Sequence, residues 1–547
     1  MAKSKYEYVK SFEVRDKIML PTIIVVVIDG RNFRRFAEVH EFAKPLDGKA
    51  LDLMKSCATA VMEKFGDISF SYGFSDEFSF VLKKDVEIYN RRESKLLSVL
   101  VSFFTSMFVK KWQDFFPQKL RFAPSFRARV VQCPTLEVLQ TYLDWRQREC
   151  HLNYLYDTCL WNLIRMEGRD PVNETDETDA ETKARKILEG TQKKFKHDLL
   201  FKQFKINYNN LPPMFRRGTF LIRTKCVVEH LANGVAVNRS TKKIVEVHSV
   251  INKCFWNQHP SLIAEFGGLE NDINFHNTGY IESFQVQDKL MLSTWIVVRI
   301  DGRNFHGFSA SHNFTKPNDI SALNLMNSCG AAVLDEFKDI IFAYGASDEF
   351  SFVLRKDSKL YDRHRSGVVS AIVSFFTSMY IMKWKEFFQQ KELQYQPSFD
   401  GRAVCYPSLG ILRDYLSWRQ VDCYINYQYN TCFQLLVDSR LEGCHARNIL
   451  EHMPSQKKND MLKNIDSAIS LEIFRRGSCI FWDKACVDSN ILFKIYHLCK
   501  FWNKVKTLSC GDDSPWKIVI EHCDIIDEAF WKAHPWILCE ERSGPSA

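Results

Sequence analysis

The sequence predicts an α+β protein made of two homologous domains in tandem. The octapeptide SDEFSFVL occurs at 75–82 and again at 347–354, and each copy follows an identical IDGRNF. Around both copies, apolar runs of strand length alternate with stretches of helical periodicity. Because the copies lie a whole domain apart, they indicate a duplicated domain and not the short repeat of a solenoid.

Further motifs recur in the same order and mark the extent of each copy. They are VSFFTSM at 101–107 and 373–379, FRRG at 215–218 and 474–477, and FWNQHP at 255–260 against FWKAHP at 530–535. We therefore expect a first domain over 1–268 and a second over 275–547, with almost no linker between them.

The composition is that of an ordinary soluble globular protein. Apolar residues make up 46% and charged residues 26% of the chain, and the formal net charge of +8 only hints at an anionic partner. No run approaches the roughly 20 apolar residues of a membrane helix, so we expect no membrane partner. The N-terminus, MAKSKYEYVK, lacks the apolar stretch of a signal peptide. We expect a nuclear or cytosolic protein, with the nucleoplasm favoured.

In the first copy, the predicted order of elements is strand, helix and hairpin. TIIVVVI at 22–28 is a β-branched run typical of a buried strand. Apolar residues follow at helical intervals over 50–65. ISFSYGF at 68–74 and EFSFVL at 77–82 then form the arms of a hairpin. WIVVRID and IIFAYGASDEFSFVL repeat the arrangement in the second copy.

Two aspartates meet at one end of this predicted sheet. Asp29 ends the first strand, and the hairpin turn would place Asp76 beside it; Asp301 and Asp348 repeat the pair. Carboxylates so close together are costly unless a positive charge lies between them. Mg²⁺ prefers a few carboxylates plus substrate phosphates, and two ions about 4 Å apart activate an attacking oxygen and stabilise a leaving phosphate. Duplicated metal sites are therefore predicted, with the backbone of 30–34 suited to cradling a triphosphate.

Two further segments of the first copy are candidates for anion binding. RRESK places Arg91, Arg92 and Lys95 at the start of a helix, where phosphate binds well, although a solvated helix start has the same pattern. KKFKHDLLFKQFK at 193–205 mixes lysines with phenylalanines at helical spacing, and Arg216 and Arg217 follow. This suits phosphate contacts beside an apolar anchor, and equally an amphipathic helix with a solvated basic face.

The segment before these lysines is acidic and polar. EGRDPVNETDETDAET at 167–182 contains almost no apolar residues. We expect it to form a mobile surface loop.

Taken in order, the motifs resemble those of the eukaryotic tRNA(His) guanylyltransferases. They are IDGRNF, FxKPxD (Phe42, Lys44, Pro45, Asp47), SDEFSF, RRESK, WRQxxCHxN at 145–153 and INYNNLPPMFRRG at 206–218. The resemblance runs through both halves, and the tandem arrangement is similar to the plant form. It implies two polymerase/cyclase-like palm domains, each an antiparallel sheet with flanking helices and a helical C-terminal extension, the second partly degenerate.

The family's reaction adds one guanosine to the 5′ end of histidine tRNA in the unusual 3′-to-5′ direction. The resemblance implies that ATP first adenylylates the 5′-monophosphate, that the 3′-hydroxyl of GTP then displaces AMP, and that pyrophosphate is finally removed. It implies two Mg²⁺ ions per active site, histidine tRNA as partner, and a homodimer of fused chains that mimics a tetramer.

Residue roles follow from the matched motifs. Metal ligands would be Asp29, Gly30, Asp76, Asp301, Gly302 and Asp348, with Glu77 and Glu349 completing the catalytic carboxylates. Nucleotide contacts would come from the same aspartates and glycines with Arg31, Asn32, Phe33, Arg34, Lys44, Ser75, Arg92, Lys95, Arg303, Asn304, Phe305, His306, Lys316 and Ser347. Contacts to tRNA would come from His151, Asn153, Lys193, Lys194, Arg216 and Arg217.

Each copy departs from the family pattern in different places. The second copy has Gly367 where the first has Lys95, Tyr424 where the first has His151, and no counterpart of INYNNLP. The first copy has FRAR at 126–129 in place of the family's FDGR, and Arg34 where the family has histidine. Neither copy therefore carries every residue of the family's motifs.

Three functions stay open at this level. The first is an active guanylyltransferase in which both domains keep their carboxylates. The second is a regulator that binds tRNA and nucleotide without turnover. The third is another palm-type nucleotidyl enzyme, such as a nucleotide cyclase, which would need nucleotide alone.

Overall fold

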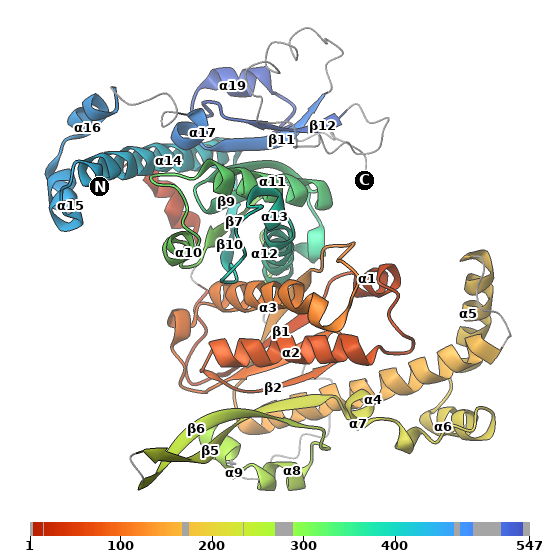
Figure 1. The fold of residues 1–547 in the computed structure, drawn as a ribbon. Coiled ribbons are helices and arrows are strands. Elements are labelled where there is room, and N and C mark those ends of the chain that lie inside the picture. The colour runs from red at the N-terminus through yellow and green to blue at the C-terminus, as the bar shows by residue number, and fades with distance from the viewer. Residues whose placement is uncertain are drawn as a thin grey trace. The chain divides into compact units, whose positions relative to one another are not determined.

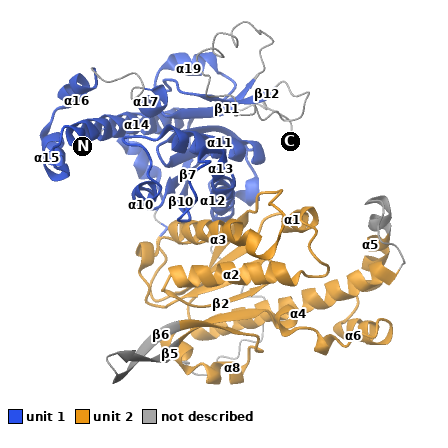
Figure 2. Ribbon diagram, viewed as in Figure 1, with its two compact units in different colours: residues 1–16, 288–547 blue, residues 17–287 orange. Residues whose placement is uncertain are grey.

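The computed structural model describes residues 4–14, 16–166, 174–232, 235–267, 288–463, 471–484 and 516–539. The chain divides into two compact units (Figure 2). The first-repeat unit contains residues 17–287, and the second-repeat unit contains residues 1–16 and 288–547. The predicted boundary, between 268 and 275, lies outside the described residues.

The first-repeat unit is built on a six-stranded antiparallel sheet of order β4-β1-β3-β2-β5-β6. Figure 1 labels β1, β2, β5 and β6 of this sheet. The strands are β1 (Ile23–Gly30), β2 (Ile68–Phe74), β3 (Glu77–Leu82), β4 (Phe126–Cys133), β5 (Thr219–Ala232) and β6 (Val235–Val247). The described helices are α1 (Phe33–Val39), α2 (Gly48–Lys64), η2 (Ile88–Arg91), α3 (Glu93–Phe115), α4 (Leu136–Met166), α5 (Glu174–Leu188), α6 (Lys193–Lys202), η3 (Tyr208–Asn210), α7 (Pro213–Arg217), α8 (Lys253–Gln258) and α9 (Pro260–Glu265).

The second-repeat unit repeats this sheet with the order β10-β7-β9-β8-β11-β12. Its strands are β7 (Trp295–Gly302), β8 (Ile340–Ala346), β9 (Glu349–Leu354), β10 (Phe399–Tyr406), β11 (Ser478–Lys484) and β12 (Trp516–Glu521). Its described helices are η1 (Glu7–Phe12), α10 (Phe305–Ser311), α11 (Ile320–Glu336), η5 (Leu360–Arg363), α12 (Arg365–Met382), α13 (Trp384–Phe387), α14 (Leu409–Asp438), α15 (Gly443–His452), α16 (Ser455–Leu462), α17 (Glu472–Arg476) and α19 (Glu528–Ala533).

Side chains of the central strands point alternately to the two faces of the sheet, and helices pack on both faces. In β1, Val25 and Val27 face a cluster that contains Tyr142 of α4, whereas Phe80 of β3 points to the opposite face and contacts Phe104 of α3. Both faces are covered, so the strand reads as a continuous apolar run. The predicted fold class, an α+β sheet with flanking helices, is confirmed.

The C-terminal part of each copy differs from the expected helical extension in one respect. It contains the expected helices, but it also supplies two strands to the sheet, β5 with β6 and β11 with β12. β5 pairs with β2, and β11 pairs with β8, which would otherwise each be an open sheet edge. The extension therefore completes the palm sheet as well as covering it.

The prediction of a loop over 167–182 is wrong for its second half. Residues from Glu174 onward form α5, while 167–173 lie outside the described residues. Ala184 and Leu188 are buried in a cluster with α4. These apolar residues follow the acidic window, so the window alone did not reveal the helix that they anchor.

One helix of the described part of the chain, α12, is long and apolar enough to cross a membrane by those two criteria. Of that stretch, 67% is buried inside the unit, where α12 packs against β10 and α11. Core helices of soluble domains have the same composition, so this helix is weak evidence for a membrane span.

The N-terminal helix η1 belongs to the core of the second-repeat unit. Val9 is fully buried in a cluster with Trp295 and Leu416. The Tyr8 hydroxyl donates to the Asp414 carboxylate, and Lys10 lies 5.1 Å from the Trp418 ring centroid. The chain's first residues thus stabilise its second repeat.

Val9→Ala should lower the unfolding free energy of the second-repeat unit by about 2 kcal/mol, because it removes two buried methyl groups and leaves a cavity. Thermal unfolding followed by circular dichroism measures the change. Val14→Ala is the matched control, since Val14 is 63% exposed. Equal midpoints for the two variants would contradict the docking of η1.

Candidate active sites

The predicted pair of aspartates lies together at one end of the first sheet. The β2–β3 turn places Ser75 at φ 52°, and the Gly30 amide donates to the Asp76 carbonyl at 3.1 Å. Burial, followed by the nearby Asp29 and Glu77 charges, raises the pKa of Asp76 to about 6. The hairpin therefore brings the two carboxylates to one site, as the sequence predicted.

The second sheet repeats this arrangement. Ser347 has φ 57°, and the Gly302 amide donates to the Asp348 carbonyl at 3.0 Å. Burial, followed by the charges of Asp348, Glu349 and Asp400, raises the pKa of Asp301 to about 7. Negative charges thus crowd this end of the second sheet.

Gly30 and Gly302 allow each carboxylate to approach the backbone. A Cβ atom built on Gly30 would lie 2.7 Å from Oδ2 of Asp76, and one on Gly302 would lie 2.9 Å from Oδ2 of Asp348. Any larger residue would push the carboxylate away. The glycine of IDGRNF is therefore required by the site.

The glutamate after each of these aspartates is held by a buried arginine of the long helix. Arg146 of α4 forms an ion pair with Glu77, and Nε of Arg419 in α14 lies 2.7 Å from Oε1 of Glu349. Gln147, next to Arg146, donates to the carbonyls of Arg217 and Ser249. The repeated WRQ motif therefore links the helix to the sheet.

Sequence reasoning named Glu77 and Glu349 but missed Arg146 and Arg419. The signal was present in the recurrence of WRQ, but nothing in the spacing indicates that these arginines reach a strand. The partners of the two glutamates are arginines, which suits a positioning role for these carboxylates.

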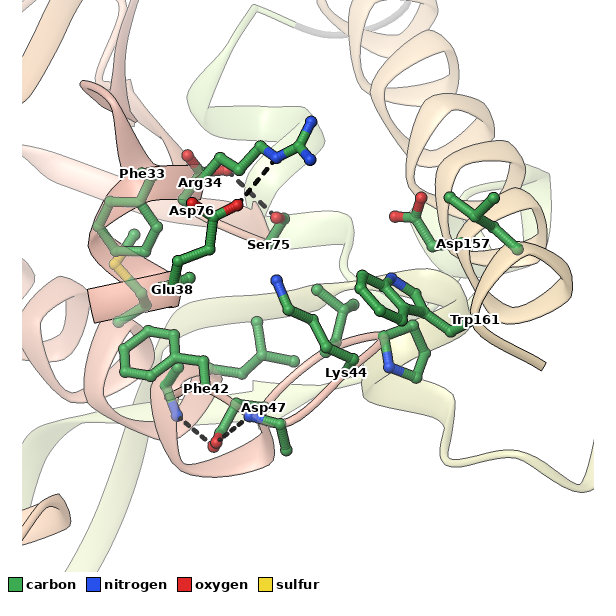
Figure 3. Close-up of a pocket in the computed structure, with 18 of the residues that line it drawn as sticks. Phe33, Arg34, Glu38, Phe42, Lys44, Asp47, Ser75, Asp76, Asp157 and Trp161 are labelled. Carbon is green, nitrogen blue, oxygen red and sulfur yellow. Dashed lines mark hydrogen bonds and ion pairs between the residues drawn. The ribbon is translucent and has the colours of Figure 1, made fainter. Parts of the chain in front are cut away.

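A cavity of about 740 Å³ opens beside Asp76 in the first-repeat unit. Five predicted nucleotide-binding residues line it, namely Phe33, Arg34, Lys44, Ser75 and Asp76. In Figure 3, Lys44 points into the space between Ser75 and Asp76 on one side and Asp157 and Trp161 on the other.

Several charged side chains line this cavity. Arg34 forms ion pairs with Glu38 at 3.0 Å and with Glu181 of α5 at 3.4 Å. The Lys44 ammonium lies 5.1 Å from the centroid of the Trp161 ring. Burial raises the pKa of Asp157 to about 6. Sequence reasoning did not place Glu181 here because it assigned that segment to a loop.

The second-repeat unit has a corresponding cavity of about 470 Å³. The predicted residues Phe305, His306, Lys316, Ser347 and Asp348 line it, as do Asn430 and Arg447. In both copies the cavity is therefore lined by the aspartate of the SDEFSF motif and by the lysine of the FxKPxD motif. The remaining residues of each IDGRNF motif lie in β1, β7 and the turns that follow.

Arg91 has a structural role and is not part of an anion site. It is 1% exposed. Its Nε, Nη1 and Nη2 atoms donate to five backbone carbonyls, those of Ile18, Met19, Thr22, Lys84 and Val86. A guanidinium has five N–H donors, so none is left for a phosphate. Arg363 binds carbonyls in the same way in the second unit.

Arg92 and Lys95 lie away from the cavity that the other nucleotide residues share. Arg92 is the N-cap residue of α3, and the Lys95 ammonium lies 5.8 Å from the Tyr89 ring centroid. Neither is among the described residues that line the cavity.

Part of the predicted tRNA-binding set gathers around Tyr208. The Tyr208 hydroxyl lies 3.1 Å from Nδ1 of His151, and the Arg216 guanidinium lies 6.0 Å from the Tyr208 ring centroid. Burial, followed by the charges of Lys193, His197 and Arg216, lowers the pKa of His151 to about 4. This histidine is therefore neutral at physiological pH.

The other members of that set lie at the surface of the same region. Asn153 and Lys194 are exposed, and Arg217 donates to the His248 carbonyl at 3.4 Å. The buried face of α6 is formed by Leu199 and Leu200.

Phe195 and Phe201 are 44% and 62% exposed. The spacing of the phenylalanines correctly predicted helix α6, but Phe195 and Phe201 do not form its buried face.

Two palm sheets, each with aspartates beside a cavity that carries a lysine, define a nucleotidyltransferase. The family model described as tRNAHis guanylyltransferase matches residues 6–134 and 278–407, and the model of the Thg1 C terminal domain matches 137–263 and 410–527. The chain belongs to the tRNAHis guanylyltransferase family, with both family domains present twice.

Two plant proteins are similar over nearly the whole chain. It is 50% identical to tRNA(His) guanylyltransferase 1 of Arabidopsis thaliana, covering 98% of this chain and 91% of that protein. It is 47% identical to tRNA(His) guanylyltransferase 2 of the same plant, covering 98% and 99%. The solved tRNA(His) guanylyltransferase of Saccharomyces cerevisiae is 40% identical over 38% of this chain and 93% of that one, with a TM-score of 0.36.

Proposed function

We propose that this protein adds a guanosine to the 5′ end of histidine tRNA by 3′-to-5′ nucleotidyl transfer, as a step of tRNA processing. The observation that carries the proposal is the cavity of the second-repeat unit, which joins Asp348 of SDEFSF to Lys316 of FxKPxD. A phosphate chain bound there would reach from a carboxylate-bound cation to a fixed ammonium.

Mg²⁺ fits the donor set of the second repeat. Asp301 faces Asp400 across β7 and β10, and the Asp348 carboxylate lies over the Gly302 backbone. Hard oxygen donors of this kind suit Mg²⁺. We propose that Asp301, Asp348 and the Gly302 carbonyl hold the metal, with two ions in the loaded site. When bound, Mg²⁺ would stabilise charge on the transferring phosphate.

The chain's own groups would then bind and orient the nucleotides. We propose that Lys316 and His306 contact the triphosphate and that Ser347 contacts the nucleotide next to Asp348. A 5′-phosphate oxygen of the tRNA would attack the α-phosphorus of ATP and release pyrophosphate. The 3′-hydroxyl oxygen of GTP would then attack the activated 5′-phosphorus and release AMP. Attack of water on the α-phosphorus of the added guanosine's 5′-triphosphate would then release pyrophosphate and leave a 5′-monophosphate.

The activity is tested by incorporation of labelled GTP into 5′-monophosphorylated histidine tRNA, with ATP and Mg²⁺. We expect incorporation that requires ATP and stops when EDTA removes the metal. Tight tRNA binding without incorporation would instead favour a regulator. Cyclic nucleotide formed from GTP without RNA would favour a cyclase.

Two further proposals accompany this function. A homodimer of fused chains would match the tetramer that the single-domain family forms, and light scattering that gives a monomer would contradict it.

We also propose a nuclear or cytosolic location, with the nucleoplasm favoured, which fluorescence microscopy of the tagged chain would test.

The basic surface of α6 is proposed to contact the tRNA. Phe201 is 62% exposed on the helix that carries Lys193 and Lys194. An exposed aromatic ring among lysines suits a base stacked on its face, worth about 1–3 kcal/mol.

Phe201→Ala should therefore weaken binding of histidine tRNA by about tenfold. Filter binding measures the affinity. Phe201→Trp is the control and should retain affinity, because it keeps an aromatic face. The thermal midpoint should not change in either variant, because Phe201 is exposed. Unchanged tRNA affinity in Phe201→Ala would contradict the stacking contact.

A further inference from the structure

The two repeats differ at the residue that faces the first metal aspartate across the sheet. In the first-repeat unit, Asp29 of β1 is paired in register with Arg127 of β4. In the second-repeat unit, Asp301 of β7 is paired in register with Asp400 of β10. Directly opposed like charges destabilise a sheet and opposite charges stabilise it. The same backbone position therefore carries a cation in one repeat and a carboxylate in the other.

Arg127 binds the aspartate that would hold the metal. Nη2 and Nε of Arg127 lie 2.6 and 3.1 Å from Oδ2 of Asp29. On the other oxygen, Nη1 of Arg129 lies 3.4 Å from Oδ1. Both carboxylate oxygens of Asp29 are thus occupied by guanidinium groups. A divalent ion would have to displace these contacts and would then lie beside a fixed positive charge.

In the second repeat, the arginine that corresponds to Arg129 pairs with a different carboxylate. Arg402 stands where Arg129 does, and its Nη1 lies 2.5 Å from Oε2 of Glu13, which follows the N-terminal helix η1. Arg299 lies 3.8 Å from Glu349 and 3.9 Å from Glu13. Within the described residues, no ion pair reaches Asp301 or Asp348. Glu13 of the N-terminal segment is therefore the ion-pair partner of Arg402, whereas the corresponding Arg129 of the first repeat contacts the metal aspartate.

We propose that the chain's metal-dependent chemistry is confined to the second repeat, and that Arg127 replaces the metal in the first. The donor set around Asp29 and Asp76 does not fit a divalent ion, whereas that around Asp301 and Asp348 does. The first repeat keeps its cavity with Lys44, and it keeps the INYNNLP segment that the second lacks. Its role is to bind nucleotide or tRNA without catalysing transfer. This division of roles deepens the proposed function.

Binding of Mn²⁺ to the full-length chain tests the proposal without tRNA, GTP or turnover. Electron paramagnetic resonance measures free Mn²⁺ during a titration and gives the number bound. We expect Asp348→Ala to remove the bound Mn²⁺ and Asp76→Ala to leave the number unchanged. Arg127→Asp should add Mn²⁺ binding in the first repeat. Asp400→Arg should abolish Mn²⁺ binding in the second repeat. Circular dichroism confirms that each variant is folded.

Arg127→Gln provides a second route to the same answer. It removes the cation without adding a carboxylate, and it should also open the first site to Mn²⁺. No Mn²⁺ bound to the wild-type chain, or equal losses in Asp76→Ala and Asp348→Ala, would overturn the proposal. Because the titration contains no substrate, a chain that failed to guanylylate tRNA would still give a clear result here.

Discussion

Asp348→Ala is expected to reduce incorporation of GTP into histidine tRNA by a factor of about 1,000 or more, equivalent to at least about 4 kcal/mol of barrier. The Asp348 carboxylate is positioned by the Ser347 turn over Gly302. Without it, the Mg²⁺ that we propose for the second repeat would lack one of its carboxylate ligands. The rate under single-turnover conditions with excess enzyme measures the chemical step.

Asp76→Ala is the matched control for this variant. Asp76 occupies the same position in the first repeat, where Arg127 and Arg129 already neutralise the neighbouring Asp29. We expect a loss of about tenfold or less, arising from altered contacts in the first cavity. An equal or larger loss in Asp76→Ala would assign catalysis to the first repeat or to both.

Arg419→Met is expected to lower the unfolding free energy of the second-repeat unit by about 3 kcal/mol, because it removes the nearer of the two arginines that pair with the buried Glu349 carboxylate and leaves only Arg299, at 3.8 Å. The side chains of Arg419 and Glu349 are 8% and 15% exposed. The Arg419 guanidinium also lies 4.5 Å from the Trp418 ring centroid. Urea unfolding, followed by tryptophan fluorescence, measures the change.

The double variant Arg419→Met, Glu349→Gln is the control for this prediction. It removes the carboxylate charge that the single variant leaves with only the more distant Arg299 as its partner, so it should recover part of the lost stability. A loss below about 1 kcal/mol in Arg419→Met would show that the ion pair is exchangeable with solvent.

The sequence predicted the position of the aspartates because their placement is a local property. A β-branched run ending at Asp29 and an alternating hairpin after Asp76 fix neighbouring strands and the turn between them. The partners of these residues depend instead on register between distant strands. Arg127 was visible as a departure from FDGR, but only the pairing of β1 with β4 places it on Asp29.

Long-range packing accounts for the other differences. The association of Val9 and Glu13 with the second repeat joins segments at opposite ends of the sequence. No periodicity or composition within residues 4–14 indicates which repeat they join. Arg91 shows the same limit, since an arginine at a helix start is equally suited to phosphate or to backbone carbonyls, and burial decides between them.

Crystals of the full-length chain soaked in Mn²⁺ provide the most direct test of the division between the repeats. Anomalous scattering locates each bound ion without assumptions about activity. The account predicts peaks beside the carboxylates of Asp301 and Asp348, and none between Asp29 and Asp76, where Arg127 keeps its contacts. Peaks of equal height in both repeats, with Arg127 displaced from Asp29, would contradict it.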